Sequence, residues 1–334
     1  MRRNFQHQFQ AYMTTKQQLD TASSWDKYWQ GTQDQSAFSD GGVNHPALQT
    51  YWLNFFQELT ENSPKSTLNM LDLACGNGAL LHLLELSGTA DRFNVTCVDT
   101  SEAALSAVSE KFPKAQTTLA SALDTQLDSH SYDVVVSQFG LEYAGLEAVD
   151  EAIRLVTEGG QIRLLLHFKG GAIAGECTRN QQVVDAFMAT GFLNAAKALF
   201  DTGYAAAQGG DRQAYDAAGK TLSKILPQVE HLIQGAGTLA AADLLEKLYL
   251  DVGKIHNNLL KYDPSDVTAW LAQSESECHA YLNRMQSMLD AALDESQFHD
   301  VCRRLEQAGL KVAHAGPLLP HDNNRALAWA ISTE

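Results

Sequence analysis

The sequence predicts an α/β fold, a doubly wound and mostly parallel seven-stranded sheet that ends in an antiparallel hairpin. Between residues 68 and 168, short apolar runs alternate with segments whose apolar residues recur at helical spacing. This alternation is typical of parallel strands joined by crossover helices. Near the end of the chain, two apolar runs are separated only by "PHDNN" at 320–324, which is too short for a crossover helix. These last two strands should therefore pair antiparallel.

Each expected element follows from its own residues. The first helix is expected over 45–60, where apolar residues recur three and four positions apart. Apolar runs then predict strands at 68–74, 93–101, 132–139 and 160–168, with amphipathic helices at 78–88, 102–112 and 146–156. The last helix is expected at 297–309, followed by strands at 310–319 and 325–332.

The alternation stops after Gly170 and returns only near residue 295. Between these points the chain is rich in Ala, Leu and Gln, and its apolar residues keep helical spacing, most clearly at Leu244, Leu248 and Val252. We therefore expect a large all-helical insertion before the last helix and hairpin. The expected parts are an N-terminal aromatic arm and helix (1–64), the α/β core (65–172 and 295–334) and the insertion (173–294).

Composition excludes several classes of function. The 334 residues carry a formal net charge of −16. The electrostatic field of a protein with this charge repels the phosphate backbone of DNA and RNA on average, so no nucleic acid partner is expected. The five cysteines show no CxxC pair, so we expect neither a metal site nor a disulfide framework. No apolar leader and no run of about 18 apolar residues appears, which predicts a cytoplasmic protein without a membrane partner.

The stretch "LDLACGNGALL" at 71–81 indicates a ligand site. Gly76 and Gly78 follow the first strand of the alternating region, where a glycine turn lets the backbone approach a ligand and the next helix presents its N–H groups. Asp99 ends the second strand about 20 residues later, the spacing at which a carboxylate accepts the hydroxyls of a ribose. Together these features predict an adenosine-containing ligand.

The segment "LDLACGNG" resembles the first motif of class I S-adenosylmethionine-dependent methyltransferases of the small-molecule type. Asp72, Gly76 and Gly78 match that motif, and Ala74 stands at the position of its commonest first glycine. The resemblance covers roughly 65–170 and 296–332, and it implies S-adenosyl-L-methionine as the cofactor. A nicotinamide dehydrogenase is disfavoured because Leu81 stands where its third glycine would be.

The resemblance also assigns roles to residues of this chain. It implies that Asp72 holds the methionine end of the donor and that Asp99 holds the ribose. The segment before the third predicted strand of the core should bind adenine. The cofactor-binding residues implied are Asp72, Ala74, Gly76, Gly78, Asp99, Thr100, Ser121, Ala122, Leu123, Gln138, Phe139 and, in the aromatic arm acting as a lid, Tyr28.

Methyl transfer from a sulfonium is an in-line displacement, which mainly requires alignment of the acceptor and exclusion of water. Candidate catalytic residues at strand ends are His167, Glu142 and Tyr143. Structural roles remain open for them, since a strand-end histidine is often only a hydrogen-bonded core residue and a glutamate can start a helix.

Three functions are compatible with these residues. The first is an enzyme that methylates a small-molecule acceptor, which the insertion selects. The second is a donor-binding protein without turnover that acts through its insertion, and the third is a protein or RNA methyltransferase. The insertion could also form a homo-oligomer, and the sequence leaves this alternative open.

Overall fold

The structure is a computed structural model that describes residues 29, 45–320 and 325–334. The chain divides into two compact units. Unit 1 comprises Met1–Gly175 and Ser287–Glu334, and unit 2 comprises Glu176–Gln286. Each unit has its own core, and each is described by itself below.

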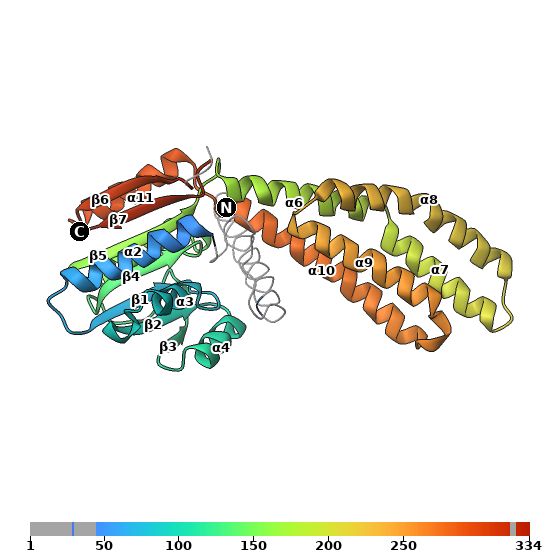
Figure 1. Cartoon of the computed structure of the whole chain (residues 1–334), viewed down its shortest axis with the longest axis horizontal. Helices are drawn as coiled ribbons and strands as arrows, with labels where there is room; N and C mark the ends of the chain where they lie inside the picture. The colour runs from blue at the N-terminus through green and yellow to red at the C-terminus, as the bar shows by residue number, and fades with distance from the viewer. Residues whose placement is uncertain (1–28, 30–44, 321–324) are drawn as a thin grey trace, which may run out of the picture. The chain divides into compact units, whose positions relative to one another are not determined.

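Unit 1 is built on a seven-stranded sheet with the order β3-β2-β1-β4-β5-β7-β6 (Figure 1). Strands β1 to β5 pair in parallel, whereas β7 pairs antiparallel with both β5 and β6. This topology confirms the predicted fold class and the antiparallel hairpin. The strands are β1 (Leu68–Leu73), β2 (Phe93–Asp99), β3 (Gln116–Leu119), β4 (Tyr132–Gln138), β5 (Val156–His167), β6 (Val312–Leu318) and β7 (Ala328–Thr333).

Helices cover both faces of this sheet. Val134 and Val136 of β4 pack into one apolar cluster with Trp52 and Phe56, while Val135 packs into a second cluster with Phe298. Because successive side chains of a strand point to opposite faces, the two clusters mark the two sides of the sheet. The helices of unit 1 are α2 (Pro46–Asn62), α3 (Ala79–Leu86), α4 (Glu102–Lys111), α5 (Ala148–Leu155) and α11 (Glu295–Gln307), with short turns η1 (Ala90–Arg92) and η2 (Leu141–Tyr143).

Local sequence signals fix where several of these helices begin. The His45 Nδ1 accepts from the Ala47 N–H, and Pro46 occupies the first position of α2. The Ser101 hydroxyl accepts from the Ala104 N–H at the start of α4. Asp294 forms a capping box with the third residue of α11.

Strands β3 and β5 differ from expectation. No strand was predicted at the position of β3, because its four residues "QTTL" are mostly polar and exposed at the edge of the sheet. Strand β5 begins at Val156 rather than at 160, since the chain passes directly from the end of α5 into the strand. A register shift in its pairing with β4 accommodates this early start.

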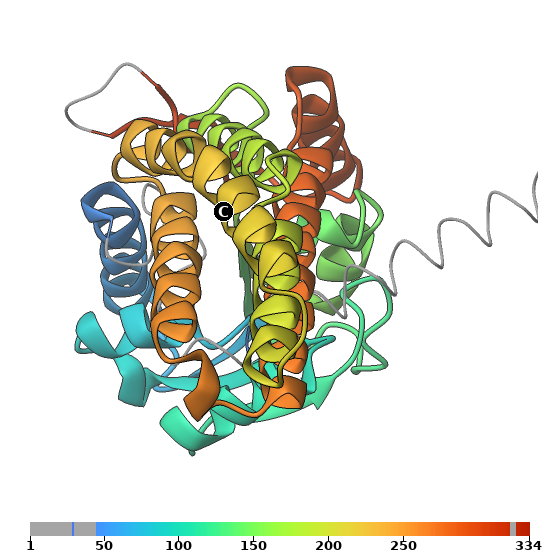
Figure 2. The ribbon, with the colours of Figure 1, turned by 90° about the vertical axis from the view of Figure 1, so that its right-hand side faces the viewer.

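Unit 2 is all helical, and its helices lie side by side (Figures 1 and 2). Its core contains Phe187, Phe192, Phe200, Leu245 and Val252, all buried. The boundary between the units falls within the first and the last of these helices. The helices are α6 (Ala172–Ala189), α7 (Phe192–Ala207), α8 (Arg212–Ala236), α9 (Ala240–Asn257) and α10 (Pro264–Ala291), with the short turn η3 (Leu259–Lys261).

One helical stretch, Ala172–Ala207, is long and apolar enough by composition to cross a membrane. Several of its large apolar side chains pack inside the protein, since Val184, Phe187 and Phe200 are buried in the core of unit 2. Core helices of water-exposed proteins carry the same composition. Packing in the core of unit 2 is therefore one reason for the apolar character of this stretch.

Candidate active site

The sheet topology brings the predicted site residues to one edge. Because β1, β2, β4 and β5 run parallel, their carboxyl ends lie together, and in open α/β sheets ligands bind at that edge. Tyr28 lies outside the described residues. The other predicted residues occupy β1 and its turn (Asp72, Ala74, Gly76, Gly78), the end of β2 (Asp99, Thr100), the segment after β3 (Ser121, Ala122, Leu123), the end of β4 and η2 (Gln138, Phe139, Glu142, Tyr143) and the end of β5 (His167).

The turn after β1 has a left-handed backbone at three residues. Ala74, Gly76 and Gly78 have φ angles of 55°, 53° and 86°, a region that favours glycine. A Cβ at Gly76 would also lie 2.9 Å from a ring carbon of Trp29, so the indole of that residue packs directly on the turn. A Cβ at Gly140, after β4, would lie 2.6 Å from the Cβ of Ala74. The turn is therefore closely packed and tolerates only small residues.

Asp72 is a buried carboxylate on β1, only 1% exposed. Neither of its oxygens has a hydrogen-bond partner among the described residues. Burial, followed by the charge of Asp99, raises the pKa of Asp72 well above its ordinary value. Buried acceptors without donors call for an explanation in a native structure. The ammonium group of S-adenosylmethionine supplies N–H donors and positive charge, so this carboxylate fits the role that the resemblance implies.

Asp99 ties the second strand to the glycine turn. One carboxylate oxygen accepts from the Gly76 N–H at 2.8 Å and the other accepts from the Ser101 N–H at 2.9 Å. Burial raises the pKa of Asp99, and these backbone hydrogen bonds oppose that effect. Each carboxylate oxygen has a second lone pair. Asp99 can therefore accept ribose hydroxyls while it holds the turn, and Thr100 beside it is exposed.

The segment predicted to bind adenine lies against Asp99. The Ala120 N–H donates to the carbonyl of Asp99 at 3.1 Å. The Leu123 N–H then donates to the Ser121 hydroxyl at 3.2 Å, which closes a short turn. Ala122 is buried, whereas Leu123 is 39% exposed. The exposed side chain of Leu123 provides an apolar surface of the kind that a purine ring contacts.

The end of β4 is held in place by α2. Trp52 Nε1–H donates to Gln138 Oε1 at 2.6 Å, which fixes the amide of Gln138 at the strand end. Phe139 follows with a φ of 54°, an uncommon conformation for a bulky residue. Its ring centroid lies 4.6 Å from that of His167. The strained backbone thus turns the Phe139 ring toward the end of β5.

Glu142 and His167 form a buried pair across the ends of β4 and β5. His167 Nδ1 lies 2.6 Å from Glu142 Oε1, and the backbone N–H of His167 donates to the same oxygen at 2.7 Å. Both residues are almost fully buried. In the neutral imidazole, donation from Nδ1 to a carboxylate places the basic lone pair on Nε2. Tyr143 lies edge-on to the imidazole, with centroids 5.7 Å apart.

Sequence reasoning named Glu142 and His167 separately but did not pair them. It also missed Trp52 as the partner of Gln138 and Gly140 as the neighbour of Ala74. No local signal could have found these contacts, because the partners of each are 25, 86 and 66 residues apart, respectively. Trp29 follows Tyr28 in the predicted aromatic arm, and its contact with Gly76 is compatible either with a lid or with an arm that is anchored to the core.

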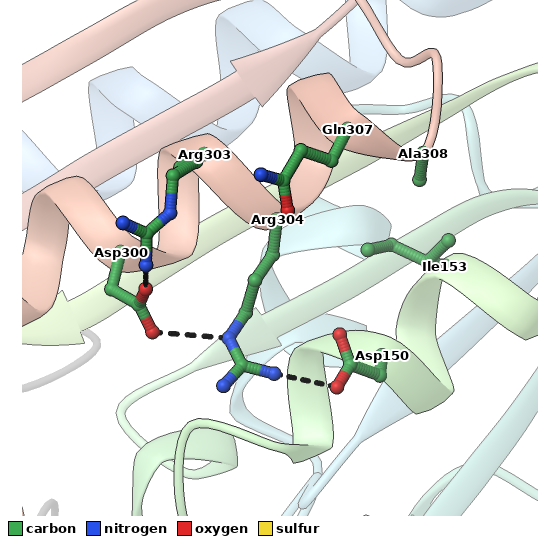
Figure 3. Close-up of a pocket in the computed structure, with 7 residues that line it drawn as sticks. All are labelled: Asp150, Ile153, Asp300, Arg303, Arg304, Gln307 and Ala308. Carbon is green, nitrogen blue, oxygen red and sulfur yellow. Dashed lines mark hydrogen bonds and ion pairs between the residues drawn. The ribbon is translucent and has the colours of Figure 1, made fainter.

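Two cavities of unit 1 lie away from this edge. One of about 420 Å³ lies between α5 and α11 (Figure 3), where Arg304 bridges Asp150 and Asp300. Arg303 also pairs with Asp300, so the charges of this cavity neutralise one another. The other, about 400 Å³, is lined by residues at the amino ends of β1, β4 and β5. Neither cavity contains a predicted site residue.

The described part of the chain holds no group of three or more His, Cys, Asp or Glu side chains arranged to bind a metal ion. The carboxyl and imidazole groups at the ends of β4 and β5 can support acid–base chemistry. The carboxylate of Glu142 orients the imidazole of His167 at the same edge of the sheet as the glycine turn and Asp99, and such an imidazole can accept a proton.

Comparison with known proteins gives a consistent result. Residues 71–164 match the family model described as "Methyltransferase domain". A segment of 119 residues is 30% identical to the ubiquinone/menaquinone biosynthesis C-methyltransferase UbiE of Campylobacter jejuni, covering 33% of this chain and 50% of that protein. UbiE proteins of other strains match at 29% identity over the same length. The chain thus spans about half the length of the curated relatives it matches.

Two solved structures show a general likeness. The CurJ carbon methyltransferase is 12% identical, with 85% of this chain and 53% of that chain covered and a TM-score of 0.42. The YcgJ protein of Bacillus subtilis is 16% identical, with 36% and 51% covered and a TM-score of 0.30. At these TM-scores the likeness supports no inference about this chain.

Proposed function

We propose that this chain, whose residues 71–164 match the methyltransferase domain model, is an S-adenosylmethionine-dependent enzyme that methylates a small-molecule acceptor, and that this acceptor must lose a proton as it reacts. The observation that carries the proposal is the buried pair of Glu142 and His167. A general base adds little for an amine or a thiolate acceptor but helps a hydroxyl or a carbon acid. A base held this firmly therefore favours the second kind of acceptor.

When bound, S-adenosylmethionine supplies a methyl group on a sulfonium, whose carbon–sulfur bond breaks with the electron pair remaining on sulfur as the acceptor bonds to the methyl carbon. The chain's residues have to align the acceptor and receive its proton. Asp72 and Asp99 hold the two ends of the donor, and Gly76 and Gly78 let it approach the backbone. His167 Nε2 takes the proton of the acceptor.

Glu142 prepares His167 for that step. It fixes the ring orientation and the Nδ1 tautomer through one short hydrogen bond, and it stabilises the imidazolium that forms when Nε2 gains the proton. Phe139 and Tyr143 line the imidazole and exclude water from it. Glu142 is thus a positioning residue and His167 is the proposed catalytic base.

Two further considerations support the choice of acceptor. The net charge of −16 disfavours a nucleic acid. The curated relatives carry the name C-methyltransferase, and a carbon acceptor next to a hydroxyl or carbonyl group is an acid of the kind that His167 would serve. Selection of the acceptor by unit 2 and a cytoplasmic location are part of the same proposal.

The test compares wild type with His167→Gln. We expect wild-type protein to transfer label from methyl-labelled S-adenosylmethionine into the small-molecule fraction of a host extract. His167→Gln should bind S-adenosylhomocysteine as wild type does, while transfer falls by roughly 10²- to 10⁴-fold, the usual contribution of a general base. His82→Gln is the matched control, since His82 is exposed on α3.

Other outcomes would contradict the proposal in distinguishable ways. Label in the protein or RNA fraction would identify a different class of acceptor. Intact binding of S-adenosylhomocysteine without any transfer by wild type would indicate a donor-binding protein without turnover. Full transfer by His167→Gln would remove His167 from the chemistry.

A further inference from the structure

We infer that the acceptor carries a hydrogen-bond donor, a hydroxyl or N–H next to its reacting atom, and that Glu142 Oε2 binds this group. The inference rests on the proposed function and specifies its substrate class as neutral, planar and hydroxyl-bearing. It follows from the hydrogen bonds that the two oxygens of Glu142 do and do not make.

The two carboxylate oxygens of Glu142 differ in their partners. Oε1 accepts from both the backbone N–H and Nδ1 of His167. Oε2 is buried and has no hydrogen-bond partner among the described residues. A buried carboxylate oxygen without a donor is costly, so its retention beside the proposed base indicates that a ligand supplies the donor. The same carboxylate would then orient both the base and the acceptor.

The buried carboxylate of Glu142 favours a neutral ligand over an anionic one. Glu142 is buried and acidic, and its Oε2 lacks a donor among the described residues. The basic side chains of the adjoining segments, Lys169 and Arg325, are exposed. A phosphate or carboxylate beside the base would be desolvated against the Glu142 carboxylate and repelled by it. A neutral ligand with hydroxyl donors avoids that cost.

The aromatic side chains favour a planar ligand. The rings of Phe139 and Tyr143 both contact the imidazole of His167, with centroid distances of 4.6 and 5.7 Å. Aromatic rings next to a reacting group favour flat partners through stacked or edge contacts. An aromatic or enolic ring with two neighbouring oxygens meets all three requirements. One group would lose its proton to His167 while the other donates to Glu142 Oε2.

Catechol, 1,2-dimethoxybenzene and benzoate test this inference by calorimetry on the wild-type protein saturated with S-adenosylhomocysteine. Catechol carries two donors, the dimethoxy compound has a related shape without donors, and benzoate is an anion. We expect catechol to bind about 10- to 100-fold more tightly than either of the others, as expected for one hydrogen bond to a charged oxygen. Benzoate or the dimethoxy compound binding as tightly as catechol, or no binding of catechol, would overturn the inference.

Glu142→Gln provides the second arm, since it replaces one carboxylate oxygen with an amide nitrogen that cannot accept. We expect it to lose the preference for catechol over 1,2-dimethoxybenzene and to retain the affinity for S-adenosylhomocysteine. Glu147→Gln, on the exposed side of the same segment, should retain both. A full catechol preference in Glu142→Gln would contradict the assignment of Oε2. Donor affinity and label transfer report on the proposed function separately, and the wild-type ranking stands if the variant fails to fold.

Discussion

Asp99 holds the glycine turn through its carboxylate, and the same carboxylate is predicted to bind the ribose of the donor. Its carboxylate accepts the N–H groups of Gly76 and Ser101, which holds the glycine turn and the start of α4 in register with β2. A carboxylate has acceptor capacity beyond these two bonds, and the predicted role uses it for the hydroxyls of a ribose. A substitution at this position should therefore affect both donor affinity and the stability of the turn.

Asp99→Ala is expected to weaken binding of S-adenosylhomocysteine by about 1.5 to 3 kcal/mol, the usual contribution of hydrogen bonds to a charged acceptor. The melting temperature should fall as well, because the Gly76 N–H loses its partner. Calorimetry and thermal unfolding measure the two effects. Asp91→Ala is the matched control, since Asp91 is exposed and pairs with Lys114. An unchanged affinity would remove Asp99 from the donor site.

At the residue scale, the sequence predicted what depends on neighbours along the chain. Asp72, Gly76 and Asp99 were found because strand, turn and helix follow one another within about 30 residues. The bond between Glu142 and His167 depends on β4 and β5 lying side by side and on η2 turning back over their ends. Such a contact becomes visible only once the strand order is known.

At the element scale, α5 holds the segment that follows β3. Glu151 Oε1 accepts from both the backbone N–H and the hydroxyl of Thr125, and both Glu151 oxygens accept from the Arg154 guanidinium. Burial would raise the pKa of Glu151, but these hydrogen bonds prevail and hold it at about 2. Because Thr125 lies just after Leu123, this network supports the segment predicted to bind adenine.

Glu151 gives the stability of unit 1 a defined pH dependence. Its folded pKa of about 2 lies below its ordinary value of 4.5, so the unfolded chain binds the proton more readily and folding favours the ionised form. The contribution is therefore fully present above pH 4.5 and lost as the pH falls toward 2. We expect about 1 to 2 kcal/mol, reduced by water around the partly exposed Arg154.

Urea unfolding of wild type and Glu151→Gln between pH 3 and 7 measures this contribution. The difference in the free energy of unfolding should be constant from pH 7 down to about 5 and should shrink below that, since the carboxylate of the unfolded wild-type chain then takes up its proton. Glu110→Gln, on the exposed side of α4, should show no such trend. A difference that does not change with pH would show that the carboxylate charge is not responsible.

The elements that the sequence located share one property, a strong apolar pattern. Strand β4 has four consecutive buried residues, whereas β3 has none. An edge strand buries one side at most and so carries little apolar signal. The hairpin of β6 and β7 was found by a different route, since the short connection excluded a crossover helix.

At the scale of the whole molecule, the two units have separate apolar cores. The clusters that cover the sheet contain residues of unit 1, and the helical cluster contains residues of unit 2. The segment between α10 and α11 is hydrogen-bonded to the end of β5, next to the candidate site. The Leu293 N–H donates to the His167 carbonyl, and the Leu293 carbonyl accepts from the Lys169 N–H and from Trp329 Nε1–H.

This separation predicts the outcome of removing unit 2. Replacing 176–286 with a Gly/Ser linker of about 10 residues should leave unit 1 folded and able to bind S-adenosylhomocysteine, because both sheet clusters remain complete. Methyl transfer should be lost if unit 2 selects the acceptor. Thermal unfolding, calorimetry and the label-transfer assay give the three results.

A second replacement, whose end is extended from residue 286 to residue 294, serves as the control. The sequence predicted an insertion that ends at 294, but a deletion to that residue would also remove Leu293, which is buried in the sheet cluster and hydrogen-bonded to the strand that carries His167. Replacing 176–294 should therefore lower the melting temperature well below that of the 176–286 replacement, since it removes the Leu293 side chain and three hydrogen bonds at once. Equal stability of the two proteins would show that the return segment does not fasten the end of β5. If the protein with residues 176–286 replaced fails to fold, the core of unit 1 depends on unit 2.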